Sequence, residues 1–201
     1  MDRTLVDVAY IVKYPQPGRV KTRLAASIGD QSAAQWYRAA AAKTFAVLKS
    51  FSEFRVTVSF DPPETLEPVK QWLPGAPNYL AQCTGGLGDR LRHVATTLWT
   101  ENHRPLLLIG GDCPGIDEEY LQQAIDVLRN NRHVIGPATD GGYVLLGLWK
   151  PVPTVFSNIS WSTNQVLSQT KERIRSHSDS LTLLPPLSDV DTEQDMRKYE
   201  P

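Results

Sequence analysis

Residues 106–115 read Leu-Leu-Leu-Ile-Gly-Gly-Asp-Cys-Pro-Gly, an apolar run followed by two glycines and an aspartate. The apolar run predicts a buried strand, because it is short and is bounded by turn residues. In open α/β sheets, ligands bind outside the carboxyl ends of the strands. We therefore expect Asp112 to point into a crevice there, as a candidate ligand for a divalent cation that carries phosphate oxygens.

Strand-like and helical patterns alternate along the whole chain. Strands are predicted at 6–13, 54–60, 106–109, 133–138, 143–149 and 181–184, and helices at 32–50, 66–72, 87–98, 117–129, 163–177 and 192–199. This alternation is typical of an α/β fold with a mostly parallel sheet covered by helices on both faces. With neither an internal repeat nor an interdomain linker in view, residues 1–201 are expected to form a single domain. The irregular segment 150–162 is a candidate binding loop.

Composition excludes several classes of protein. The formal net charge of −1 gives no overall attraction to nucleic acid or to an anionic membrane. No apolar run approaches the roughly 20 residues that a membrane helix needs. The first four residues show no secretory signal pattern, so a cytoplasmic protein is expected. The two cysteines, Cys83 and Cys113, form neither a zinc ribbon nor a disulfide framework, and Cys113 is predicted to be a small apolar residue of a turn.

A basic segment follows the first predicted strand. Residues 13–23 read Lys-Tyr-Pro-Gln-Pro-Gly-Arg-Val-Lys-Thr-Arg. Lysine and arginine side chains form charge-assisted hydrogen bonds with phosphate, which suits a cradle for a di- or triphosphate. A solvated basic surface is the alternative, and the segment is not a Walker loop. The residues proposed to hold phosphate are Lys13, Gly18, Arg19, Lys21 and Arg23.

Acidic residues recur in two later segments. Asp140, with Gly141 and Gly142 after it, lies between two predicted strands, where an ordinary hairpin turn is the alternative interpretation. Near the end of the chain, Thr192 is a predicted helix N-cap, with Asp195 three residues on. That role leaves the neighbouring carboxylates unexplained. Asp191 and Asp112 are predicted to share one Mg2+ (or Mn2+) ion, whose remaining ligands would be phosphate oxygens and water.

A weaker signal precedes the predicted helix 87–98. The segment 82–90, which reads Gln-Cys-Thr-Gly-Gly-Leu-Gly-Asp-Arg, places glycines at a helix N-terminus, which favours anions. A flexible connection explains these glycines equally well.

Taken in order, these motifs resemble an uncharacterised bacterial transferase family of the nucleotide-diphospho-sugar transferase superfamily, of the GT-A glycosyltransferase type. More distantly, the chain is similar to the guanylyltransferases for molybdenum cofactor and for phospholactate. The motifs are K-x-P-x-P-G-x-V-K-T-R-L (13–24), G-G-L-G-D-R (85–90), G-G-D-C-P-G (110–115), G-P-A-x-D-G-G-Y (136–143) and D-V-D-T-x-x-D (189–195).

The resemblance implies a Rossmann-like three-layer αβα sandwich that binds a nucleoside di- or triphosphate. It implies that the basic segment binds phosphates and that Asp112 and Asp191 bind the metal. It also implies that Asp140, Gly141 and Gly142 contact the acceptor or sugar. Asp112 and Asp140 are the catalytic candidates. Two departures are visible: the first loop lacks the glycine-rich G-x-G-x-R pattern of nucleotidyltransferases, and Asp112-Cys113-Pro114 lacks the second aspartate of a D-x-D pair.

The predicted function is a metal-dependent transferase that uses a nucleotide sugar or a nucleoside triphosphate, as a glycosyltransferase or a nucleotidyltransferase. Its partners would be that donor and an unidentified small-molecule acceptor, with no nucleic acid. Asp140 and the aromatic residues Tyr143, Phe156 and Trp161 are candidates to face the acceptor, with simple packing as the alternative. The competing hypothesis is a non-catalytic nucleotide-binding or partner-binding module that retains the fold, since a fold does not fix a function. The oligomeric state cannot be read from the sequence.

Overall fold

The computed structural model describes residues 5–152, 154–177 and 180–199. The first four residues, where no secretory signal is expected, lie outside this range, as does one residue of the predicted binding loop 150–162. None of the described helices is long and apolar enough to span a membrane. In chain order the elements are β1 (Val6–Lys13), α1 (Thr22–Ile28), α2 (Asp30–Ser50), β2 (Phe54–Asp61), the 3-10 helix η1 (Pro63–Thr65), α3 (Leu66–Trp72), β3 (Asn78–Ala81), α4 (Leu87–Asn102), β4 (Leu106–Gly110), α5 (Glu118–Arg129), β5 (His133–Pro137), β6 (Tyr143–Leu148), α6 (Val166–Arg175), β7 (Leu181–Leu183) and α7 (Glu193–Arg197).

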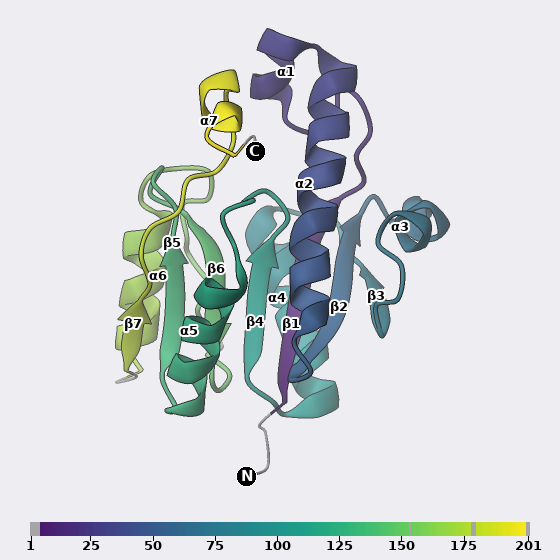
Figure 1. The fold of residues 1–201 in the computed structure, drawn as a ribbon. Coiled ribbons are helices and arrows are strands. Elements are labelled where there is room, and N and C mark those ends of the chain that lie inside the picture. The colour runs from purple at the N-terminus through teal and green to yellow at the C-terminus, as the bar shows by residue number, and fades with distance from the viewer. Residues whose placement is uncertain (1–4, 153, 178–179, 200–201) are drawn as a thin grey trace.

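The strands form one sheet in the order β3-β2-β1-β4-β6-β5-β7. β6 runs antiparallel to its neighbours β4 and β5, whereas the other pairs are parallel. The predicted mostly parallel α/β sheet is therefore confirmed. All strands except β6 end at the same edge, which is the upper edge in Figure 1.

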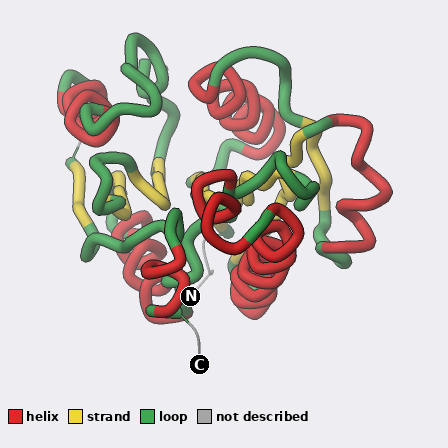
Figure 2. The backbone as a smooth tube through the Cα atoms, turned by 90° about the horizontal axis from the view of Figure 1, so that it is seen from above, coloured by secondary structure: helices red, strands yellow, loops and turns green. Residues whose placement is uncertain are grey.

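Helices cover both faces of the sheet (Figure 2). Alternate residues of β1 enter different cores: Val8 and Tyr10 pack in the cluster that includes residues of α2 and α5, whereas Ala9 packs with residues of α4 and α6. This alternation is the two-residue period of a strand buried on both sides. It explains why residues 6–13 read as an almost continuous apolar run.

Among the described residues, the structure adds three elements that the sequence patterns did not predict: α1, η1 and β3. β3 has only four residues, all half-buried, so it lacks the buried–exposed alternation of a longer strand. Two helices are shorter than predicted at both ends: α7, expected at 192–199, covers Glu193–Arg197, and α6, expected at 163–177, covers Val166–Arg175. The hydroxyl of Thr163 accepts a hydrogen bond from the Gln165 amide and donates one to the Ser160 carbonyl, which makes a turn in place of the first helical turn.

Above the carboxyl edge, α1 and α7 lie side by side (Figure 1). A small apolar cluster that includes Leu24 and Val190 joins them, with Met196 packed against it. Thr192 caps α7, as predicted, because its hydroxyl accepts a hydrogen bond from the Asp195 amide. The packing of α1 on α7 brings the basic segment after β1 next to the acidic segment before α7.

At the opposite edge of the sheet, Asp7 is a buried carboxylate whose side chain is only 3% exposed and lies 3.8 Å from Arg104 Nη1. Burial raises the pKa of Asp7 above its ordinary value of 3.8, despite the nearby arginines. The folded protein therefore binds this proton more tightly than the unfolded chain does. Asp7 in its ionised form thus lowers stability, and the loss develops as the pH rises from 3.8 through the raised pKa.

We expect the Asp7→Asn variant to gain stability relative to the wild type as the pH rises from about 3.5 to about 7. Urea unfolding of both proteins across this range measures the difference in the free energy of unfolding. A difference that moves in favour of the wild type with rising pH would contradict the assignment.

Candidate active site

A cleft of about 870 Å³ opens at the carboxyl edge of the sheet. Small-molecule sites in proteins commonly have volumes of roughly 300–1,000 Å³. The lining comes from the basic segment after β1, the start of α4, the β4–α5 connection, the β5–β6 turn, the loop before α6 and the β7–α7 connection. This is the position where open α/β sheets bind ligands.

Most of the residues predicted from the sequence meet in this cleft. Those that line it are Lys13, Arg19, Lys21, Arg23, Asp112, Asp140 and Gly142. Gly18, Gly141 and Asp191 do not belong to the lining, although Asp191 forms ion pairs with two residues that do.

The basic segment is anchored by a buried valine, and three of its four cations, Lys13, Arg19 and Arg23, are exposed. The buried valine is Val20, which belongs to the core. Gly18 has φ +75°, a left-handed conformation that suits glycine, and the Arg19 amide closes a turn on the Gln16 carbonyl. Gly18 thus shapes the turn that presents Arg19 to the cleft.

Asp112 follows β4 through a glycine that the packing requires. A Cβ at Gly111 would lie 2.9 Å from Val12 Cγ1 and 3.1 Å from the Tyr37 hydroxyl oxygen. The Gly111 amide also donates to the Ile11 carbonyl, at 2.9 Å. The end of β4 is therefore pressed against β1, and the Asp112 side chain, 56% exposed, emerges into the cleft.

Lys21 lies between the two carboxylates predicted to share a cation. Its Nζ is 3.5 Å from Asp112 Oδ2 and 3.8 Å from Asp191 Oδ1, and its side chain is only 5% exposed. Arg23 Nη1 donates to Asp191 Oδ2, at 2.8 Å. Asp112 and Asp191, from remote parts of the chain, thus face one ammonium group.

Asp189 contributes a further carboxylate, for which the sequence analysis found no role. Burial raises its pKa to about 6, the charge of Lys21 opposes the shift, and the charges of Asp112, Asp140 and Asp191 add to it. The cleft therefore concentrates negative charge opposite its basic segment.

Cys113 has the passive role predicted for it. It is 2% exposed, and its thiol donates a weak hydrogen bond to the Ser188 carbonyl, with Sγ 3.7 Å from the oxygen. Burial raises the pKa of this thiol to about 12, so the nucleophilic thiolate is scarce near neutral pH.

The Asp140 segment is both a turn and a part of the cleft. The Asp140 carboxylate accepts a hydrogen bond from the Gly142 amide at 2.8 Å, so the hairpin interpretation is correct, and Asp140 also lines the cleft. Gly141 has φ +92°, and its Cα faces the backbone of Asn164. Of the aromatic residues proposed to face an acceptor, Tyr143 and Trp161 line the cleft, whereas Phe156 is buried in the core.

Gln82, in the β3–α4 connection, and Arg90, in α4, line a part of the cleft. The sequence signalled this segment only through its glycines, and gave neither polar residue a role. Gln82 is 7% exposed, and its amide nitrogen donates to the carbonyls of Val12 and Ser59, so it links the ends of β1 and β2. Arg90 forms an ion pair with Asp61 at 3.0 Å. The motif G-G-L-G-D-R contained Arg90, but an ion pair between distant residues has no local signal.

The same motif begins α4, whose N-terminus was a candidate anion site. Gly85, Leu87 and Arg90 line the cleft. The Asp89 carboxylate accepts a hydrogen bond from the Gly86 amide at 3.2 Å, so part of the positive helix end is already satisfied by the chain itself.

The donor set fits a hexacoordinate hard cation only in part. Across residues 5–152, 154–177 and 180–199, no group of three or more His, Cys, Asp or Glu side chains is placed to hold a metal ion. Mg2+ is, however, usually bound through one or two carboxylates together with water and substrate phosphates. Asp112 and Asp191, which converge on Lys21, are two carboxylates of the kind that Mg2+ binds.

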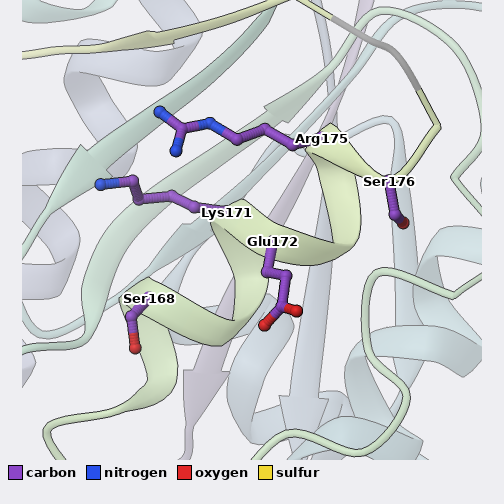
Figure 3. Close-up of a pocket in the computed structure, with 5 residues that line it drawn as sticks. All are labelled: Ser168, Lys171, Glu172, Arg175 and Ser176. Atoms are coloured by element: carbon purple, nitrogen blue, oxygen red, sulfur yellow. The ribbon is translucent and has the colours of Figure 1, made fainter.

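A second hollow, of about 440 Å³, lies on the outer surface of α6 (Figure 3). In this view Lys171 and Arg175 extend to the left of the helix, whereas Glu172 points downward. None of the residues that line this hollow lines the cleft. Most of the residues predicted to bind phosphate and metal line the cleft, and none of them lines this hollow, so we take the cleft as the candidate site.

Solved structures with similar folds include a candidate nucleotide-diphospho-sugar transferase from Desulfovibrio desulfuricans G20. It is 31% identical to this chain, with a TM-score of 0.90, and the match covers 96% of this chain and 85% of that one. CMP:2-keto-3-deoxy-manno-octonic acid synthetase complexed with CTP matches at 12% identity and a TM-score of 0.60, over 97% and 96% of the two chains. Rv0371c from Mycobacterium tuberculosis, in complex with manganese, matches at 17% identity and a TM-score of 0.53, over 97% of each chain. The last two show the fold alone.

No curated protein matches the sequence. A family model matches residues 44–163, which is more than half of the chain, and the family is described as an uncharacterised protein conserved in bacteria (DUF2064). The resemblance drawn from the motifs is confirmed at the level of the superfamily, because the fold is that of nucleotide-diphospho-sugar transferases. The chain belongs to the bacterial DUF2064 family.

Proposed function

We propose that this protein is a metal-dependent transferase whose donor is a nucleoside triphosphate or a nucleotide sugar. One observation carries the proposal: cations of the β1 segment and carboxylates of remote segments come together at one cleft, where Lys21 lies 3.5 Å from Asp112 and 3.8 Å from Asp191. A cleft with both charges suits a phosphorylated donor together with its counter-ion. The general transferase fold of the structural neighbours supports the proposal.

The chain's own residues have distinct roles in this proposal. Lys13, Arg19 and Lys21 bind the donor phosphates and stabilise the negative charge that develops on their oxygens during transfer. Asp112 and Asp191 would hold Mg2+ or Mn2+, which when bound neutralises charge on the phosphate oxygens. Asp140, which lines the cleft from the β5–β6 turn, would orient an acceptor.

Donor binding is tested by the unfolding temperature in the presence of nucleotides and nucleotide sugars, each with and without Mg2+. A ligand at 100 times its Kd adds about 2.7 kcal/mol to the free energy of unfolding. For a chain of this size we expect an upward shift of about 5–10 °C with the correct donor. Absence of a shift with every member of the panel would contradict the proposal.

The product separates the two kinds of transfer. Release of pyrophosphate indicates nucleotidyl transfer, and release of a nucleoside diphosphate indicates glycosyl transfer. Binding of a donor with no turnover would instead favour a non-catalytic nucleotide-binding module.

A further inference from the structure

Lys21 is held in an unusual position for a lysine. Its backbone is left-handed, with φ 48° and ψ 45°, a conformation that costs a non-glycine residue free energy. Its side chain is 5% exposed, whereas those of Asp112 and Asp191 are 56% and 42% exposed. The fold therefore directs a buried ammonium group between two carboxylates that remain partly exposed, of which Asp112 lines the cleft.

The contacts of this ammonium group are electrostatic and not tightly directional. Its distances to Asp112 and Asp191, 3.5 Å and 3.8 Å, are longer than a close N–H···O hydrogen bond. Asp189 and Asp140 add negative charge nearby. Lys21 is thus attracted to this place by several charges, without short bonds that would fix it there.

A divalent cation shared by Asp112 and Asp191 would need the same place. Mg2+ binds oxygens at about 2.0–2.1 Å, and a second positive charge cannot remain between the same two carboxylates. Lys21 can leave only if its charge finds another partner, because an unpaired buried ammonium is costly. The same cleft offers such a partner if a phosphorylated donor lies along the basic segment.

We propose that Lys21 competes with the divalent cation for the Asp112–Asp191 pair and moves from these carboxylates to the donor phosphates when the donor binds. This inference rests on the proposed function, because the phosphates supply the new partner. Its consequence is linkage: the free ion binds weakly to the protein alone, and the donor and the ion each raise the affinity for the other.

The test is the affinity for Mn2+ of the protein without nucleotide, measured from the electron paramagnetic resonance signal of free Mn2+. We expect Lys21→Gln to bind Mn2+ about tenfold more tightly than the wild type, within the usual range of coupling between sites. Lys13→Gln is the matched control: it removes the same charge from the cleft, but not from between the carboxylates, and should change the affinity less than about twofold. Adding Asp112→Asn to Lys21→Gln should abolish the gain.

Two outcomes would overturn the competition. One is a Lys21→Gln variant that binds Mn2+ no more tightly than Lys13→Gln, and the other is the absence of measurable Mn2+ binding in both variants. Lys21→Met, also uncharged, repeats the measurement if Lys21→Gln fails to fold, as judged by its unfolding transition. Because no nucleotide is present, this result is independent of the nucleotide panel, so failure of the competition and failure of the proposed function are distinguishable.

Discussion

Replacing Asp112 with asparagine is expected to lower turnover about 10³-fold while the protein stays folded. Asparagine keeps the size of the side chain and one oxygen, but it removes the negative charge that would hold the cation against the donor phosphates. The side chain is 56% exposed, and its described ion pair is the one with Lys21, so we expect a stability change within about 1 kcal/mol. Steady-state turnover at saturating Mg2+, together with urea unfolding, measures both effects.

The matched control is Asp126→Asn, an exposed aspartate on α5 outside the cleft, which should leave turnover unchanged. In the presence of a chelator, Asp112→Asn should bind nucleotide no more weakly than the wild type, because the phosphate-binding cations are intact and one carboxylate that attracts Lys21 is removed. Full activity of Asp112→Asn would remove Asp112 from the catalytic assignment.

Replacing Gly141 with alanine is expected to lower the free energy of unfolding by about 3 kcal/mol and to reduce turnover. At φ +92° an alanine is strained whatever the space around it, and its Cβ would lie 2.6 Å from the carbonyl oxygen of Asn164 and 2.7 Å from its Cα. These are backbone atoms, so relief requires movement of the chain. The Gly141 carbonyl also accepts a hydrogen bond from the Leu167 amide at 2.9 Å.

The movement would reach the cleft, because the displaced segment carries Trp161 and Asn164, which both line it. Gly142→Ala is the control: its φ is not positive, and the nearest atom to its Cβ is a side-chain oxygen of Asp140 at 3.2 Å. We expect that variant to lose about 1 kcal/mol or less. Equal losses in the two variants would show that the close approach of Asn164 is not what requires glycine at position 141.

Local patterns predicted much of the fold. β1 and α3 occupy the predicted ranges, and α5 begins where expected, because the Asp117 carboxylate accepts a hydrogen bond from the Tyr120 amide at 2.8 Å. Periodicity and capping act within a few residues, so the sequence states them directly. The sequence did not predict α1 and β3, because each is short and is stabilised mainly by its neighbours in the fold.

The sequence likewise predicted only some of the residues of the candidate site. The sequence indicated Asp112, Asp140 and the basic segment, because each follows a predicted strand of a sheet whose carboxyl ends share one edge. It indicated the segment 82–90 only for its glycines, and it gave no role to Gln82 and Arg90, whose contacts join β1, β2 and α4.

By itself, the sequence determined the class of sheet, most of the strands and helices along the chain, and which segments end at the ligand-binding edge. These follow from apolar periodicity and from turn residues, which are local properties. Only the tertiary structure decided that Lys21 lies between Asp112 and Asp191, that Asp189 is partly buried beside them, and that Gly141 supports a loop instead of lining the cleft. Those outcomes depend on the packing of α1 on α7 and of residue 164 on the β5–β6 turn. Contacts between remote segments produce no periodic pattern in the sequence, so the sequence does not reveal them.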